Sequence, residues 1–83
     1  MPSVEPLVLD VVKDVLGINH VEAGDSFYDF GGSSLQAMRV CVRLERDLGF
    51  AVDPELLLDS DSLGDFAQAV ARAGATAQHK GPA

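Results

Sequence analysis

The sequence predicts an all-α domain, and three observations point to that class. Four segments repeat apolar residues at helical spacing, with glycines, prolines or capping residues at their ends. Hydrophobic residues make up 47% of the chain but aromatic residues only 6%, which suits packed helices better than a β-sandwich. A chain of 83 residues supports one small domain with a thin margin of stability, and it leaves little room for a deep active site.

The first helix is expected over residues 3–16. Ser3 is its expected N-cap, Pro6 lies in the first turn, and Gly17 follows the last turn. One face of this helix is apolar and is expected to meet the core: Val4, Leu7, Val8, Val11, Val12 and Val15. Its many β-branched residues lower its intrinsic propensity, so this helix depends on packing.

A long loop is expected over residues 17–33. Loops of this length are uncommon in compact domains and are often functional. Asp25 and Ser26 are placed to cap a short turn within it. Its expected anchors in the core are Ile18, Val21, Phe27 and Phe30.

Two further helices follow this loop in quick succession. The second helix is expected over residues 34–48, where Gly49 ends it. A short third helix then runs from Pro54 through Leu58, with Asp53 as its N-cap.

The last helix opens at a pattern that resembles a capping box, Ser62 followed three residues later by Asp65. Its apolar stripe consists of Leu63, Phe66, Ala67 and Val70. Gly74 is expected to end it. The domain is therefore predicted over residues 3–74, and the segment 75–83, which has no pattern, is predicted to be a disordered tail.

A run of glycines and serines, Phe30-Gly31-Gly32-Ser33-Ser34-Leu35, stands at the start of the second helix. The glycines allow a tight turn and keep side chains away. Free amide groups and the helix dipole favour negative charge at such a helix start. A serine hydroxyl here is well placed to carry a phosphate ester, which indicates a tether and not a catalyst.

The second helix presents two different faces. Its core face consists of Ala37, Val40, Cys41, Leu44 and Leu48. The opposite side carries Arg39, Arg43 and Arg46, and an apolar strip of Leu35, Met38 and Val42 lies between the two. This strip is either part of a wide buried stripe or an exposed surface for docking partners, and the second interpretation is favoured. The three arginines give this helix a net charge of about +1, so the rest of the chain carries about −8.

Composition excludes several classes of partner. A formal net charge of −7 disfavours nucleic acid and anionic membranes. A single cysteine permits no internal disulfide and no cysteine-based zinc site, and no metal is expected. No apolar run approaches the ~20 residues of a membrane span, and the start of the chain lacks a signal-peptide pattern. We therefore expect a cytoplasmic monomer.

The segment from Asp25 to Arg39 resembles the phosphopantetheine attachment signature of carrier proteins. It is most similar to the peptidyl carrier (thiolation) domains of nonribosomal peptide synthetases. The resemblance extends over about Leu7 to Ala71. Its specificity comes from context, because the phenylalanine anchors, the amphipathic second helix, the short third helix and the last helix occur in the family's order.

The resemblance implies a four-helix bundle with a short third helix and a long first loop. It also implies that a phosphopantetheinyl transferase moves 4′-phosphopantetheine from coenzyme A onto Ser34. The terminal thiol of the arm then carries an aminoacyl or peptidyl thioester. The implied partners are an adenylation or loading enzyme and downstream condensation or tailoring enzymes.

Several alternatives remain open. Ser33 stands where the family often has Asp or His, so it is either the helix cap or itself the modified residue. The pair Gly31-Gly32 and the arginines of the second helix favour a peptidyl carrier over a fatty-acid carrier, whose second helix is usually acidic. A polyketide-type acyl carrier is one alternative, and an unmodified helical interaction domain of carrier fold is another. Met1 and the short tail favour a free-standing protein.

No catalytic residue is expected in this chain. A nucleophilic serine needs an adjacent base, and the two histidines are His20, in the loop, and His79, in the expected tail. A hydrolase that uses Ser34 is therefore disfavoured. Cys41 lies on the core face and is expected to be a small core hydrophobe.

Overall fold

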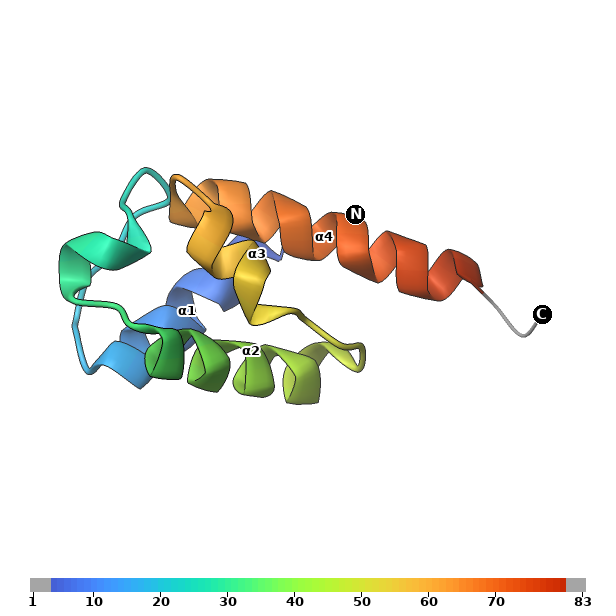
Figure 1. Cartoon of the computed structure of the whole chain (residues 1–83), viewed down its shortest axis with the longest axis horizontal. Coiled ribbons are helices and arrows are strands. Elements are labelled where there is room, and N and C mark those ends of the chain that lie inside the picture. Colours follow the sequence, from blue (N-terminus) through green and yellow to red (C-terminus); the bar gives the residue numbers. More distant parts are fainter. Residues whose placement is uncertain (1–3, 81–83) are drawn as a thin grey trace.

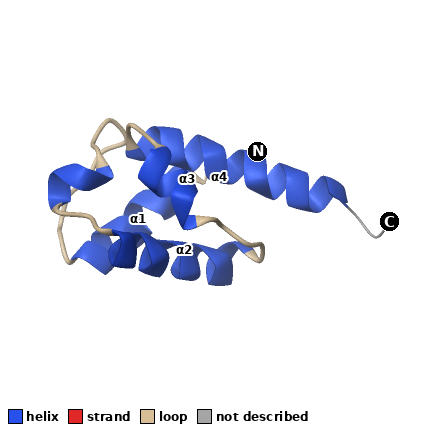
Figure 2. Ribbon diagram, in the orientation of Figure 1, coloured by secondary structure: helices blue, strands red, loops and turns tan. Residues whose placement is uncertain are grey.

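The computed structural model describes residues 4–80, which form helices and loops (Figure 1). The α-helices follow one another along the chain as α1 (Glu5–Leu16), α2 (Ser34–Leu48), α3 (Pro54–Asp59) and α4 (Leu63–Lys80). A short 3-10 helix, η1 (Phe27–Phe30), interrupts the loop between α1 and α2 (Figure 2). The predicted all-α bundle, with its short third helix and long first loop, is confirmed.

The helices form a bundle in which α2 and α4 make the two long sides. Both α1 and α3 pack against α2 and against α4, so they fill the space between those sides (Figure 1). The loop that contains η1 closes the end of the bundle at which α2 begins. The fold therefore places the glycine–serine run at one end of the molecule.

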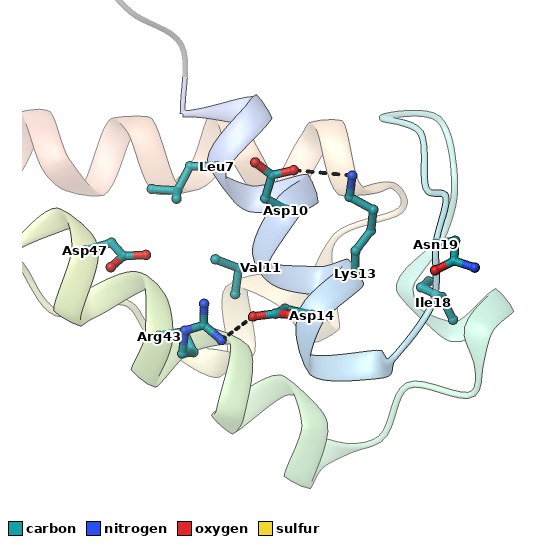
Figure 3. Close-up of a pocket in the computed structure, with 9 residues that line it drawn as sticks. All are labelled: Leu7, Asp10, Val11, Lys13, Asp14, Ile18, Asn19, Arg43 and Asp47. Atoms are coloured by element: carbon teal, nitrogen blue, oxygen red, sulfur yellow. Dashed lines mark hydrogen bonds and ion pairs between the residues drawn. The ribbon is translucent and has the colours of Figure 1, made fainter.

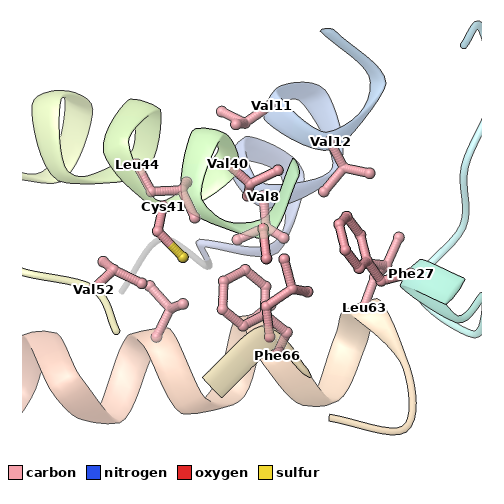
Figure 4. Packing of buried hydrophobic residues seen from close by; sticks show 14 of the residues in the cluster. Val8, Val11, Val12, Phe27, Val40, Cys41, Leu44, Val52, Leu63 and Phe66 are labelled. Atoms are coloured by element: carbon pink, nitrogen blue, oxygen red, sulfur yellow. The ribbon is translucent and has the colours of Figure 1, made fainter. Parts of the chain in front are cut away.

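The core draws side chains from each helix and from the long loop (Figure 4). The largest side chains buried in it are Phe27, Phe66, Leu44, Leu57 and Leu63, with several valines around them. Among the described residues, no polar or charged side chain is buried. Burial of apolar area is thus the main force that holds the helices together.

Helix α1 begins later than predicted. Val4 occupies the N-cap position and makes no side-chain capping bond, so the helix starts at Glu5, and Ser3 lies outside the described residues. The predicted end is confirmed, because Gly17 adopts a left-handed φ of 70° and donates its amide to the carbonyl of Lys13.

The long loop is ordered by local hydrogen bonds and by bonds to α4. Ser26 caps η1 by accepting a hydrogen bond from the Tyr28 amide at 3.2 Å, which confirms the predicted short turn. The carbonyls of Ala23 and Asp25 each accept a 2.8 Å hydrogen bond from the first turn of α4. The loop therefore supplies partners for amides that a helix start leaves unpaired.

The starts and ends of α2 and α3 agree with the predicted signals. Gly49 closes α2 with a φ of 85°, and the Asp53 carboxylate accepts from the Glu55 amide at 2.9 Å to cap α3. The intervening loop is fastened to α2, because Glu45 Oε2 accepts a 2.9 Å hydrogen bond from the Val52 amide.

Helix α4 starts as predicted but does not end at Gly74. Ser62 Oγ accepts from the Asp65 amide at 3.1 Å, and the helix then continues to Lys80. Gly74 is buried, and a Cβ built there would lie 2.6 Å from Cζ of Phe50. This glycine therefore allows a close approach between a helix and an aromatic ring. The segment 75–80, predicted to be disordered, is helical, and residues 81–83 lie outside the described part.

Replacing Gly74 by alanine should destabilise the fold. Alanine is the better helix former by about 1 kcal/mol, but its methyl group would overlap the Phe50 ring. We expect a net loss of about 1–3 kcal/mol in the free energy of unfolding, measured by urea denaturation. Gly24→Ala is the control, since a Cβ at Gly24 meets no atom within 4 Å. Equal stability of both variants would contradict this account of Gly74.

Candidate functional site

The two glycines before the serines have separate structural reasons. Gly31 has a left-handed φ of 76° and closes η1 by donating its amide to the Tyr28 carbonyl at 3.1 Å. At Gly32 a Cβ would lie only 2.4 Å from Cε2 of Phe27. The predicted tight turn is confirmed. The space at Gly32, however, is taken by the Phe27 ring, so the second glycine is required by the protein's own packing.

The two serines play different structural roles. Ser33 is extended, with φ −129° and ψ 173°, and its Oγ accepts a 3.4 Å hydrogen bond from the Gln36 amide as the N-cap of α2. Ser34 is the first helical residue and is exposed. The predicted cap at Ser33 is therefore confirmed. Capping occupies the hydroxyl of Ser33, whereas the hydroxyl of Ser34 is not needed for it.

The apolar strip on α2 is exposed. Leu35, Met38 and Val42 expose 60%, 53% and 57% of their surface, so the alternative of a wide buried stripe is wrong. The core face of α2 is buried as predicted, except that Leu48 is only partly buried. The strip borders a groove of about 590 Å³ between α2 and α1, whose lining consists of Asp14, Val15, Leu35, Met38, Arg39, Val42 and Arg43.

The three arginines of α2, Arg39, Arg43 and Arg46, differ in their contacts. Arg43 is half-buried, and its Nη1 lies 2.9 Å from Oδ2 of Asp14, which links α2 to α1 (Figure 3). Arg39 and Arg46 are exposed and make no ion pair within the part of the chain that the structure describes. Free positive charge on α2 therefore lies at Arg39 and Arg46.

A second hollow, which the sequence did not reveal, shares Asp14 and Arg43 with this groove (Figure 3). It has a volume of about 440 Å³ and lies between α1, the start of the long loop and the second half of α2. Its lining consists of Leu7, Asp10, Val11, Lys13, Asp14, Ile18, Asn19, Arg43 and Asp47. Lys13 pairs with Asp10 at 3.3 Å, and Arg43 pairs with Asp14. The two basic residues of this hollow are therefore already bound to carboxylates of α1.

Neither His20 nor Cys41 is hydrogen-bonded to Ser34 as a base. The His20 ring is exposed in the loop, and its Nε2 lies 2.9 Å from the Glu22 carboxylate. The Cys41 thiol is buried, and burial, with nearby Glu45 and Asp53, raises its pKa from 9.0 to about 11. That thiol is protonated at neutral pH and is a poor nucleophile. Over the described residues, no group of three or more His, Cys, Asp or Glu side chains could hold a metal ion.

Comparison with known proteins identifies the family. The family model for the phosphopantetheine attachment site matches residues 6–70. The chain belongs to this family. The predicted resemblance is thus confirmed, and the matched range contains η1, α2, α3 and the glycine–serine run. As a carrier domain, it bears 4′-phosphopantetheine and is non-catalytic.

Relatives among characterised proteins are large synthetases. Malpinin synthetase of Mortierella alpina is 37% identical over 68 residues, which are 82% of this chain and 1% of that protein. A linear gramicidin synthase polypeptide of Brevibacillus parabrevis is 28% identical over 67 residues, 81% of this chain and 1% of its own length. The carrier domain thus spans about 1% of the length of these relatives.

Solved structures share the fold. A peptidyl carrier protein in complex with the phosphopantetheine transferase Sfp and coenzyme A has a TM-score of 0.77 and 26% identity, over 87% of this chain and 94% of that chain. An active-site mutant peptidyl carrier protein has a TM-score of 0.78 and 26% identity, over 89% and 82% of the two chains. BlmI, a type-II acyl carrier protein from Streptomyces verticillus, has a TM-score of 0.78 at 20% identity, over 83% of each chain, and supports the fold alone.

The arginines of the carrier domain should differ in their effect on stability. Arg43→Ala removes the bond to Asp14 and should lower the free energy of unfolding by about 0.2–1 kcal/mol, because both side chains of the pair remain accessible to solvent. Arg39→Ala is the matched control and should stay within about 0.5 kcal/mol of the wild type. Both are measured by urea denaturation, and the effect of Arg43→Ala should shrink in high salt. An equal loss in both variants would refute this division.

Proposed function

We propose that the chain is a peptidyl carrier in which the Ser34 hydroxyl accepts the 4′-phosphopantetheine arm. The observation that carries this proposal is the division of roles between adjacent serines. Both serines are exposed, but Ser33 Oγ accepts the capping hydrogen bond of α2, whereas the Ser34 hydroxyl, at the first helical position, has no such role. Ser34 also precedes Leu35, as the modified serine does in the signature that this segment resembles.

The start of α2 fits a phosphodiester. The first amides of a helix have no partner within the helix, and the dipole places partial positive charge there. Gly31 and Gly32 have no side chain to cover this turn. Glycine is needed at both positions, because Gly31 closes η1 with a left-handed φ and the Phe27 ring takes the space beside Gly32. The attached group supplies a flexible arm with a terminal thiol that holds cargo as a thioester.

The carrier domain relies on a partner to activate Ser34. A hydroxyl nucleophile needs an adjacent base, and no basic side chain is bonded to Ser34 within the described residues. A phosphopantetheinyl transferase of the Sfp type is the partner we infer. The related peptidyl carrier protein that was solved with Sfp and coenzyme A supports this inference.

We infer that the cargo is an amino acid or a peptide. The relatives that support this include synthetases of malpinin and linear gramicidin. In this proposal an adenylation or loading enzyme charges the arm, and condensation or tailoring enzymes receive the cargo. The basic α2, with its three arginines, favours this class over a fatty-acid carrier.

The proposed docking surface lies on α2 beside the attachment point. It consists of Leu35, Met38, Arg39, Val42, Arg43 and Arg46, as the sequence predicted. The apolar strip within it offers exposed area to bury, and exposed Arg39 and Arg46 can meet carboxylates of a partner. Arg43 contributes chiefly by joining α2 to α1 through Asp14. The complementary partner surface is an apolar pocket with acidic residues at its edge.

The carrier unit is proposed to extend over residues 3–74 and to act as a monomer in the cytoplasm. The family match over 6–70 lies inside these bounds, and the one cysteine is buried and unpaired, as is common in a reducing compartment. Over the described residues, no helix has the length and apolar character needed to span a membrane.

Intact-mass analysis tests the attachment point. After incubation with coenzyme A and Sfp-type transferase, the wild-type chain should gain the mass of one phosphopantetheine. Ser34→Ala should gain none, because it lacks the accepting hydroxyl. Ser33→Ala is the control and should still be modified, although losing the cap should cost about 1 kcal/mol of stability.

Two results would overturn this assignment. One is an unmodified wild-type chain under conditions in which a known peptidyl carrier is fully modified. The other is full modification of Ser34→Ala together with loss of modification in Ser33→Ala, which would move the attachment point by one residue.

Charge reversal tests the docking surface. The pair Arg39→Glu and Arg46→Glu should lower kcat/KM for loading by an adenylation enzyme that charges the wild type, by about fivefold or more. The free energy of unfolding should change by less than about 0.5 kcal/mol, since both residues are exposed. Arg72→Glu, an exposed reversal on α4, is the control. A similar loss of loading in the control, or a matching loss of stability in the pair, would contradict the proposal.

A further inference from the structure

Tyr28 joins η1 to the end of α3 through its hydroxyl group. Its Oη donates a 2.8 Å hydrogen bond to the carbonyl oxygen of Leu58, which lies 30 residues further along the chain. Leu58 belongs to the last turn of α3, where helix carbonyls have no partner within the helix. The tyrosine side chain therefore completes the end of one helix from the middle of a distant loop, although the residue is 52% exposed.

The same tyrosine is connected to the backbone that precedes Ser34. Its ring packs edge-on against Phe27, with ring centroids 6.1 Å apart and planes at 67°. The Phe27 ring is buried and takes the space beside Gly32, where no Cβ would fit. The Gly32 amide also donates to the Phe27 carbonyl at 3.3 Å. A chain of contacts thus runs from α3 through two aromatic rings to the residue before the cap of α2.

We propose that Tyr28 is a positioning residue for Ser34. Its hydroxyl ties η1 to α3, and η1 in turn fixes Gly32 through Phe27, so the turn that presents the serine is held against the third helix. The expected effect of Tyr28 on phosphopantetheine transfer rests on the proposed function of Ser34. The positioning itself concerns the apo chain and is tested separately. Without the hydroxyl, η1 keeps its core anchor but loses its connection to α3.

Tyr28→Phe removes the hydroxyl alone and leaves the ring contact with Phe27. Hydrogen exchange of the apo chain should show amides of Gly32 and Gln36 exchanging about two- to tenfold faster, the loss expected for one hydrogen bond. With Sfp-type transferase and coenzyme A, kcat should fall by a similar factor while KM for the chain stays unchanged, because the α2 surface is intact. Ser60→Ala is the matched control, since it removes a hydroxyl that donates to the Leu56 carbonyl of α3 and leaves the Tyr28–Leu58 bond in place.

The outcomes are distinct. Faster exchange at Gly32 and Gln36 in Tyr28→Phe, with wild-type exchange there in Ser60→Ala, supports the proposal. Wild-type exchange and wild-type kcat in Tyr28→Phe would overturn it, as would equal changes in both variants, which would indicate a general loss of stability. If the wild-type chain is not modified at Ser34, the proposed function fails, and the exchange measurement still decides the positioning role.

Discussion

Burial of Phe27 is the interaction on which the rest of the site depends. Fixing a loop as long as residues 17–33 costs conformational entropy, and one large side chain in the core offsets part of that cost. Phe27 belongs to the same core cluster as Leu63 and Phe66 of α4 (Figure 4), and hydrogen bonds from the start of α4 to Ala23 and Asp25 hold the same loop against that helix. The ring also dictates glycine at position 32, and so the path of the chain into the serine pair. Site geometry here follows from core packing.

Helix α2 has one face that stabilises the fold and another that does not. Ala37, Val40 and Leu44 lie on its buried face, while the apolar strip is left in solvent. Exposed apolar area contributes nothing to folding, and an unpaired arginine contributes little. Substitutions on this exposed face are therefore expected to change the free energy of unfolding little, and under the proposed function partner binding can shape this face independently of stability.

Local signals in the sequence predicted most helix boundaries and the cap at Ser33, because caps and left-handed glycines act within a few residues. The predicted end of α4 at Gly74 was wrong. A glycine gives the same local signal whether it ends a helix or makes room for a ring such as that of Phe50. The bonds from Arg43 to Asp14 and from Tyr28 to Leu58 were missed. Each joins residues about 30 apart, and no spacing rule connects them before the fold is known.

The long loop contributes hydrogen-bond acceptors to another element, because the carbonyls of Ala23 and Asp25 bind amides in the first turn of α4. Surface loops commonly accept insertions and proteolytic nicks because few groups depend on their path. Here, two helix amides would lose their partners if this stretch moved away. The segment is therefore a structural part of the bundle. Although it is long, insertions or substitutions in it are expected to be tolerated less well than in an ordinary surface loop.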